Sequence, residues 1–190
     1  MTQEIEIEFK NLLTKEEYHL LLDSLHFPVE GTLQTNYYFD TKDFHLKEQD
    51  AALRIRKKND KYVLTLKEPH PEGLLETHDV LTEQEAKDWL EANPTAKTHT
   101  KNQLIQLQIA VADLQYYGSL TTERREIEYE NVLLVLDYSQ YNKTSDFELE
   151  IEAKTRSEGE KVFKSLLKKY KIEKKDTPNK IERFFHSKSN

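Results

Sequence analysis

The sequence predicts an α+β protein built on an antiparallel sheet of about eight strands. Apolar and polar residues alternate along eight separate stretches, and turn sequences such as "KKNDKY" and "EPHPEG" join neighbouring ones. Amphipathic helical segments lie between these stretches and after the last of them. The strand-like stretches cover residues 3–10, 33–40, 51–58, 61–68, 73–80, 120–130, 132–140 and 146–154.

The helices are recognised by their capping residues and by the spacing of their apolar residues. Thr14 with Glu17 three residues later forms a capping-box pattern at the start of an apolar stripe. Thr82 and Glu85 repeat the pattern at the start of a second helix. Three more helices are predicted: at residues 101–112, along the apolar stripe at 162–170, and after Thr177-Pro178, which resemble an N-cap and a first helical residue.

Composition predicts one globular domain that spans residues 1–190. No apolar run exceeds the five residues 132–136, which is far too short to cross a bilayer, and the acidic N-terminus is unlike a secretory signal. With no cysteine, the chain has no disulfide, thiolate metal site or cysteine nucleophile. The net charge of −7 argues against a nucleic-acid partner. We therefore expect a cytoplasmic protein with neither a nucleic-acid nor a membrane partner; its oligomeric state is left open.

The polar faces of the strands separate acids from bases. "EIEIEFK" at the start of the chain and "FELEIEAK" near its end carry rows of glutamates, whereas "LRIRKK" and "YVLTLK" in between carry basic residues. "LTTERREIEYE" holds both kinds on one face. The acidic rows are Glu4, Glu6 and Glu8, and Glu148, Glu150 and Glu152; the basic residues are Lys10, Arg54, Arg56, Lys67 and Arg124.

Two arrangements explain such faces. Taken strand by strand, a charged outer face is typical of any half-solvated antiparallel sheet. Taken together, the sorting of acids from bases favours a sheet that closes on itself, with polar residues inside and helices over the apolar outside. In that arrangement two carboxylates about 5 Å apart repel by roughly 3 kcal/mol at an effective dielectric constant of 20, so the converging acids need a cation.

The chemistry of this polar lining points to phosphate and a hard metal ion. Carboxylate oxygens without thiolates suit Mg²⁺ or Mn²⁺, and arginine forks suit phosphate oxygens. Together they describe metal-assisted phosphoryl chemistry. The sequence contains no Walker-type phosphate loop, no dinucleotide-binding glycine pattern and no serine nucleophile elbow, and its seven histidines show no metal-ligand spacing.

Six ordered motifs resemble the CYTH superfamily, the triphosphate tunnel metalloenzymes, which include class IV adenylate cyclases and thiamine triphosphatases. "EIEFK" at residues 6–10 matches the family's E-x-E-x-K signature. "TNYYFDT", "LRIRKK" with "LTLK", "TTERRE", "LVLDYSQY" with "FELEIE", and "TPNKIERF" resemble later parts of the family pattern, in order and over nearly the whole chain.

The resemblance implies an eight-stranded antiparallel β-barrel, or tunnel, that binds triphosphate and a divalent metal. It assigns the metal to Glu6, Glu8, Glu150 and Glu152, with Glu4, Glu76, Asp137 and Glu148 as less specific candidates. It assigns the phosphates to Lys10, Arg54, Arg56, Lys67 and Arg124, with Lys180 of the last helix reaching the tunnel. The residues expected to take part in catalysis are Glu6, Glu8, Lys10 and Glu152.

The resulting hypothesis is a hydrolase that depends on Mg²⁺ or Mn²⁺ and removes the terminal phosphate of an inorganic or organic (nucleoside or thiamine) triphosphate. A glutamate would accept the proton from the attacking water. Two alternatives remain open at this point. One is cyclisation of ATP to cyclic AMP on the same scaffold, and the other is a non-enzymatic module that binds triphosphate or a phosphorylated ligand. The sequence does not choose the triphosphate.

Overall fold

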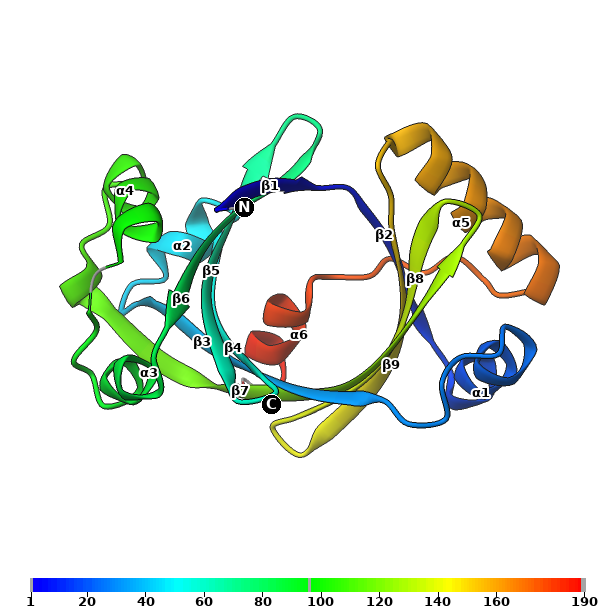
Figure 1. Cartoon of the computed structure of the whole chain (residues 1–190), viewed down its shortest axis with the longest axis horizontal. Helices are drawn as coiled ribbons and strands as arrows, with labels where there is room; N and C mark the ends of the chain where they lie inside the picture. The colour runs from blue at the N-terminus through cyan, green and yellow to red at the C-terminus, as the bar shows by residue number, and fades with distance from the viewer. Residues whose placement is uncertain (1, 96, 189–190) are drawn as a thin grey trace. The chain divides into compact units, whose positions relative to one another are not determined.

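The computed structural model describes residues 2–95 and 97–188 (Figure 1). Every stretch that the sequence predicts as a strand contains strand structure, the first of them as two separate strands, and all the pairings with a determined register are antiparallel. The strands are β1 (Gln3–Glu6), β2 (Glu8–Leu13), β3 (Thr32–Thr41), β4 (Ala52–Lys58), β5 (Lys61–His70), β6 (Gly73–Leu81), β7 (Leu114–Tyr129), β8 (Val132–Tyr141) and β9 (Thr144–Glu152). The predicted fold class, α+β with an antiparallel sheet, is confirmed, but the sheet has nine strands in the described part of the chain rather than the eight expected.

Six α-helices and one short 3-10 helix complete the described part of the chain. None of these helices is long and apolar enough to cross a membrane. They are α1 (Lys15–Ser24), α2 (His45–Glu48), α3 (Glu83–Leu90), α4 (Thr98–Gln106), η1 (Val111–Asp113), α5 (Arg156–Tyr170) and α6 (Lys180–His186).

The chain contacts divide the protein into two compact units, each made from separate stretches of sequence. The first unit takes residues 2–5 and 34–120, and its strands follow the order β1-β6-β5-β4-β3-β7. The second unit takes residues 6–33 and 121–188, with the order β7-β8-β9-β2. β7 is long enough to contribute its first half to one unit and its second half to the other.

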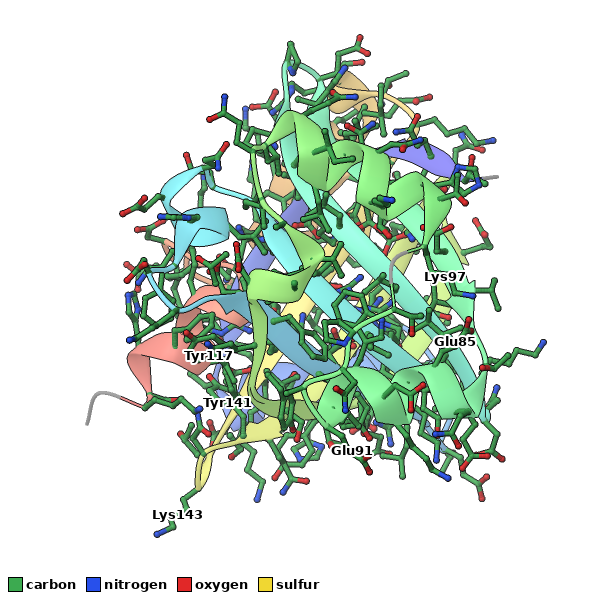
Figure 2. The ribbon with its side chains drawn as sticks, turned by 90° about the vertical axis from the view of Figure 1, so that its left-hand side faces the viewer. Glu85, Glu91, Lys97, Tyr117, Tyr141 and Lys143 are labelled. Carbon is green, nitrogen blue, oxygen red and sulfur yellow. The ribbon has the colours of Figure 1, made fainter. Side chains whose placement is uncertain are left out.

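In the first unit, α2, α3 and α4 cover the apolar face of the sheet. Trp89 of α3 meets Phe39 of β3 edge to face, with ring centroids 5.2 Å apart, beneath the side chains of β4 and β5. The capping box predicted at Thr82 is present and starts α3. Lys97, just before α4, forms an ion pair with Glu85 of α3, and Figure 2 shows the two labelled side chains next to each other. The connection after α3 is thereby tied back to the helix.

In the second unit, α1 and α5 cover the apolar face of β2, β8 and β9, whereas α6 lies on the opposite, polar face (Figure 1). The predicted capping box at Thr14 starts α1. Gly159 of α5 lies so close to the sheet that an added Cβ would come within 2.5 Å of the Phe9 ring of β2. The glycine therefore lets α5 approach β2, although glycine costs about 1 kcal/mol relative to alanine inside a helix.

Three helix predictions need correction. The helix expected at 101–112 runs instead from Thr98 to Gln106, and Gln108 beyond it has a positive φ of 60°. The last helix is capped by Asn179 rather than Thr177, because the Thr177 hydroxyl accepts the backbone N–H of Leu12 at 3.0 Å. α2 escaped prediction because its four residues are too few to show a periodicity.

The stretch predicted as one first strand, residues 3–10, is broken at Ile7 into β1 and β2. β1 belongs to the first unit up to Ile5, and β2 pairs with β9 in the second. At the break, the backbone carbonyl of Ile7 accepts a hydrogen bond from the N–H of Ala153 at 3.0 Å. Glu4 and Glu8, expected on one continuous strand face, therefore lie in different units.

Candidate active site

The polar face of the first unit carries the basic residues predicted from "LRIRKK". Leu53 and Ile55 are fully buried in the core, so the alternation of β4 puts Arg54 and Arg56 on the other face. Lys67 of β5 shares that face. The structure thus brings the three predicted phosphate ligands of this unit together.

Glu76 is the carboxylate around which this face is organised. It pairs with Lys67 across β5 and β6 in an ion pair, and Arg54 Nη2 lies 3.9 Å from Glu76 Oε1. His78 Nε2 lies 3.4 Å from the other oxygen of Glu76 and 3.1 Å from Glu4 Oε1. The basic face therefore includes an acid–histidine group at its β6 side.

Arg54 is incompletely satisfied within the described structure. Its Nε is buried and has no hydrogen-bond partner among the described residues. A buried donor without a partner is rare in native proteins, and it costs about 1–3 kcal/mol. The missing partner must be a hydrogen-bond acceptor, which fits a phosphate oxygen beside a guanidinium.

The second unit brings the predicted acids together through the pairing of β2, β8 and β9. Glu8 lies directly opposite Glu152, and Lys10 lies opposite Glu150. Directly opposed side chains on one face have Cβ atoms about 4.5–5.5 Å apart. The Lys10 ammonium donates to Glu8 Oε1 at 2.8 Å, so the acidic row is partly neutralised within its own strand.

Arg124 and Lys180 cross-link the buried carboxylates of this face. Arg124 holds Asp137 with two bonds, Nε to Oδ1 at 2.9 Å and Nη2 to Oδ2 at 2.6 Å. Its Nη2 also donates to Glu150 Oε2 at 2.5 Å. The Lys180 ammonium of α6 lies 2.9 Å from Asp137, 2.6 Å from Glu148 and 2.5 Å from Glu150. Each of the two cations thus bridges at least two carboxylates.

The pKa shifts follow from these contacts. Burial acts to raise the pKa of Glu150, but Lys180 and Arg124 outweigh it and hold that pKa well below its usual range. Burial likewise acts to lower the pKa of Lys180, and the charges of Asp137, Glu148 and Glu150 raise it well above the usual range instead. Glu150 and Lys180 are therefore both held in their ionised forms by the opposite charges around them.

The carboxylate oxygens of the second unit suit a hard divalent cation as ligands. Glu148 is fully buried, and its Oε1 has no hydrogen-bond partner among the described residues. A carboxylate oxygen accepts only, so a cation is the natural way to satisfy it. The paired glutamates Glu8 and Glu152 add hard oxygen ligands on the same face. Mg²⁺ and Mn²⁺ take such ligands.

A different group of ligands lies in the first unit. In the part of the chain that the structure describes, one set of three side chains is close enough to share an ion, with ligand atoms within 4.8 Å of one another: Glu4, Glu76 and His78. The two glutamates were the less specific candidates of the sequence, and the histidines showed no metal-ligand spacing along the chain. The other ring nitrogen of His78 lies 3.0 Å from Thr65 Oγ1, so His78 belongs to the polar face.

Sequence reasoning also missed Arg183. Its Nη2 donates to Glu148 Oε2 at 2.6 Å, and its Nε donates to Asp146 Oδ2 at 2.9 Å. Burial acts to lower the pKa of Arg183, but Glu148 and Asp146 raise it above the usual range. A signal existed, because Arg183 follows Lys180 by three residues and so shares its helix face.

The two adjacent arginines of "TTERRE" have opposite roles. Arg124 faces the carboxylates described above, as the resemblance suggested, whereas Arg125 points to the other side of β7. The Arg125 guanidinium donates to the backbone carbonyls of Pro28 and Val29, at 3.0 and 2.9 Å, and to the Tyr18 hydroxyl at 2.9 Å. Arg125 therefore fixes the loop after α1 and takes no part in the polar face.

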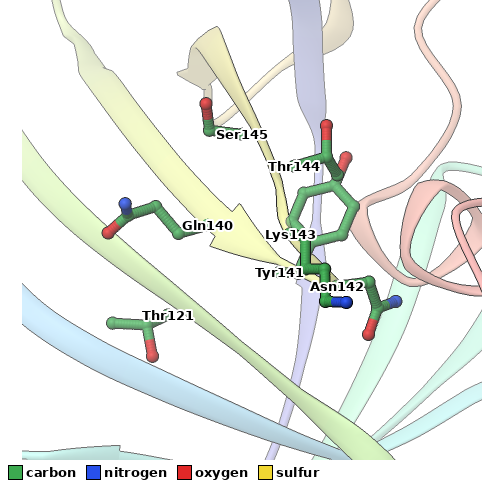
Figure 3. Close-up of a pocket in the computed structure, with 7 residues that line it drawn as sticks. All are labelled: Thr121, Gln140, Tyr141, Asn142, Lys143, Thr144 and Ser145. Atoms are coloured by element: carbon green, nitrogen blue, oxygen red, sulfur yellow. The ribbon is translucent and has the colours of Figure 1, made fainter.

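A cavity of about 620 Å³ lies at the β8–β9 hairpin (Figure 3). None of the residues predicted to bind metal or phosphate lines it. Its lining is made of hydroxyl and amide side chains with one lysine: Thr121, Gln140, Tyr141, Asn142, Lys143, Thr144 and Ser145. The ion pairs and unpaired donors place the candidate site on the polar faces rather than in this cavity.

Comparison with known proteins agrees with the motifs. The chain is 49% identical over 189 residues to "Putative triphosphatase YjbK" of Bacillus subtilis, covering 99% of this chain and 98% of the relative. A crystal structure of a "putative adenylate cyclase" from Bacillus halodurans is 43% identical, with a TM-score of 0.94 over 97% of this chain and 100% of that one.

A third relative is more distant. The protein HpAC1 from Hippeastrum, described as a "putative adenylyl cyclase" with a dominant triphosphatase activity, is 25% identical, with a TM-score of 0.78 over 96% of each chain. The model of the CYTH domain matches residues 4–185, which is nearly the whole length. The chain therefore belongs to the CYTH family.

Proposed function

We propose that this protein is a metal-dependent triphosphatase that hydrolyses the terminal phosphoanhydride bond of a small-molecule triphosphate. The observation that carries the proposal is the basic face of the first unit, where Arg54 keeps an unpaired, buried donor beside Arg56 and Lys67. A buried cationic face with an unmet need for an acceptor suits a polyanion. The Bacillus subtilis relative is named a putative triphosphatase, and the Hippeastrum relative is described as having a dominant triphosphatase activity, which supports the same conclusion.

In this proposal the basic side chains bind and orient the phosphates. Arg54 and Arg56 offer planar guanidinium forks, and Lys67, which is held in place by its ion pair with Glu76, adds a point charge. Arg124 contributes less than the sequence suggested, because its Nε and Nη2 are engaged by Asp137 and Glu150. Its Nη1, 3.8 Å from Glu152 and 4.0 Å from Glu126, is the edge of the guanidinium that we assign to a phosphate oxygen.

The acids hold the metal and handle the proton. We assign the metal to Glu6, Glu8, Glu150 and Glu152, with the buried oxygen of Glu148 as a further ligand. A bound Mg²⁺ or Mn²⁺ supplies neutralisation of the phosphate oxygens and a bound water of lowered pKa. One of the paired glutamates Glu8 and Glu152 accepts the proton of the attacking water, and the hydrogen bond from Lys10 orients Glu8 for that role.

Further parts of the proposal rest on the sequence. We assign the whole chain to one domain in the cytoplasm, favoured by the absence of cysteine. The substrate is inorganic triphosphate or an organic triphosphate such as a nucleoside or thiamine ester. Neither nucleic acid nor a membrane is a partner, given the net charge of −7.

A product assay tests the proposal. The purified protein is incubated with inorganic triphosphate, ATP or thiamine triphosphate, each in EDTA and in excess Mg²⁺ or Mn²⁺. We expect orthophosphate in the presence of metal and no turnover in chelator. Full turnover in EDTA would contradict the metal mechanism.

The same assay separates the two alternatives. Cyclase activity is favoured by the description of the Bacillus halodurans relative, and it requires pyrophosphate and cyclic AMP from ATP. A binding module would hold triphosphate tightly and release no product from any of the three compounds.

A further inference from the structure

Asn36 lies beside the basic face, on the strand next to Arg56, and it carries no charge. It lies on β3 directly opposite Arg56 of β4, and its side chain is fully buried. Its Oδ1 accepts the Arg56 Nε–H at 3.0 Å. Because that nitrogen can only donate, the contact fixes which end of the amide faces Arg56.

The other end of the amide is unsatisfied. Asn36 Nδ2 carries two N–H donors and has no hydrogen-bond partner among the residues that the structure describes. If the residue served only to orient Arg56, an aspartate would serve better, because it would accept a charge-assisted bond and leave no donor buried. The amide group is therefore the feature that needs an explanation.

A second unpaired donor lies one step further along the same face. Arg54 is separated from Arg56 by one residue of β4, about 7 Å along the strand, and its Nε also lacks a partner in the described structure. Arg54 lies opposite Tyr38, just as Arg56 lies opposite Asn36. Two neighbouring strands thus present buried donors without partners in the described structure, and a single ligand with several acceptor oxygens would satisfy both.

We propose that Asn36 binds a phosphate oxygen of the substrate through Nδ2 while its Oδ1 positions the Arg56 guanidinium for the same ligand. The inference rests on the proposed triphosphatase function and adds a neutral residue to the charged ones. A neutral amide adds a hydrogen bond to a phosphate oxygen, and it does so without adding to the charge repulsion between Arg54, Arg56 and Lys67. Asn36 is thus both a binding and a positioning residue.

Binding of inorganic triphosphate in EDTA, followed by calorimetry, tests the inference without catalysis. Asn36→Asp keeps the bond to Arg56 and removes the donor, and we expect it to weaken binding at least about thirtyfold. Asn36→Ala removes both contacts without adding charge, and we expect a loss of about tenfold. Urea unfolding of each variant checks that the fold is retained.

The matched control is Gln34→Glu, which adds the same charge two residues along the same row of β3, opposite Lys58. We expect it to weaken binding about threefold or less. Equal losses for Gln34→Glu and Asn36→Asp, or unchanged binding by Asn36→Ala, would show that Asn36 does not contact the ligand and would overturn the inference.

NMR of the unaltered protein gives a second readout that needs no variant to bind. The side-chain NH₂ signals of Asn36 are identified by their loss in Asn36→Asp. On addition of inorganic triphosphate in EDTA, we expect these signals to shift together with the Arg56 Nε–H signal. If triphosphate binds and is hydrolysed but the Asn36 signals stay in place, only this inference fails. If the protein neither binds nor hydrolyses triphosphate, the proposed function fails as well.

Discussion

The polar faces of the two units are built from the same strand pattern and differ in how far their charges are satisfied. In the first unit, Arg54 and Asn36 keep buried donors without partners among the described residues. In the second unit, Arg124, Lys180 and Arg183 bind a set of buried carboxylates with bonds of 2.5–2.9 Å. The first face thus needs an acceptor, whereas the second is mainly a finished ionic network.

We therefore expect substitutions in the second face to lower mainly the stability of the protein, and substitutions in the first face to lower mainly its affinity for ligand. Removing a cation from a satisfied, buried network leaves carboxylates uncompensated and lowers stability. Removing a cation whose donor has no partner costs little stability and lowers the affinity for the ligand that would satisfy it. The one exception in the second unit is Glu148, whose Oε1 has no partner within the described structure and points to a cation.

Lys180→Met should produce the largest effect. It leaves Asp137, Glu148 and Glu150 with one fewer cation in a buried cluster, so we expect the free energy of unfolding to fall by about 3 kcal/mol in urea titrations. Lys164→Met is the control, because its pair with Glu160 is exposed to solvent and its loss should leave the free energy of unfolding nearly unchanged. Equal effects of the two substitutions would show that the network adds nothing beyond a surface pair.

Arg54→Ala should show the opposite behaviour. We expect the affinity for inorganic triphosphate to fall by about 2 kcal/mol, or roughly thirtyfold, because a charge-assisted contact is lost. The free energy of unfolding should change by less than about 1 kcal/mol, since the substitution also removes an unpaired buried donor. Calorimetry and urea unfolding measure the two effects, with exposed Lys61→Ala of the same hairpin as control. A variant that unfolds while its folded fraction binds normally would make Arg54 a structural residue.

Glu6→Gln tests whether the acids act in turnover rather than in binding. Glu6 ends β1, where the chain enters the second unit, and the substitution keeps its size but removes its charge. We expect kcat for triphosphate hydrolysis to fall at least about tenfold, or 1.4 kcal/mol of barrier, with a smaller change in KM. Exposed Glu130→Gln in the β7–β8 turn should change neither constant. A change confined to KM would place Glu6 in binding alone.

The smallest expected effect is a change in the acid dependence of stability. The folded pKa of Glu150 is held below its unfolded value of about 4.3, so its contribution is complete above that pH and is lost as the pH falls toward the folded pKa. Glu150→Gln removes this titration, so the dependence of stability on pH below about 4.3 should flatten. Urea unfolding across this range measures the slope. An unchanged slope would mean that other carboxylates carry the acid sensitivity.

Local pattern was sufficient to predict which face the alternating residues of β4 occupy. Arg54 and Arg56 alternate with Leu53 and Ile55 in the sequence, and the structure buries the apolar pair in the core. The face occupied by Arg124 on β7 was also predictable, because side chains alternate between the two faces of a strand whatever the neighbouring strands are. The capping box at Thr14 is equally local and was predicted correctly.

Contacts between distant parts of the chain could not be predicted in this way. The break at Ile7 depends on its carbonyl accepting the N–H of Ala153, which is remote in sequence. The start of α6 depends on Thr177 bonding to Leu12 rather than capping the helix. α2 is held by Asp40, whose carboxylate accepts the N–H groups of Leu46 and Lys47 at 3.0 and 3.2 Å. Burial raises the pKa of Asp40 even though these backbone bonds act to lower it.

The sequence by itself determined the eight strand regions, their polar and apolar faces, and the residue types suited to phosphate and metal, because periodicity and side-chain chemistry are local properties. Tertiary structure decided which of those charges meet. In the folded chain Lys180 and Arg183 both bind the buried carboxylate of Glu148, whereas Arg54 and Asn36 keep donors that have no partner in the described chain. The reason is that strand register and helix placement follow from packing over the whole chain, and they alone determine which opposite charges come within bonding distance.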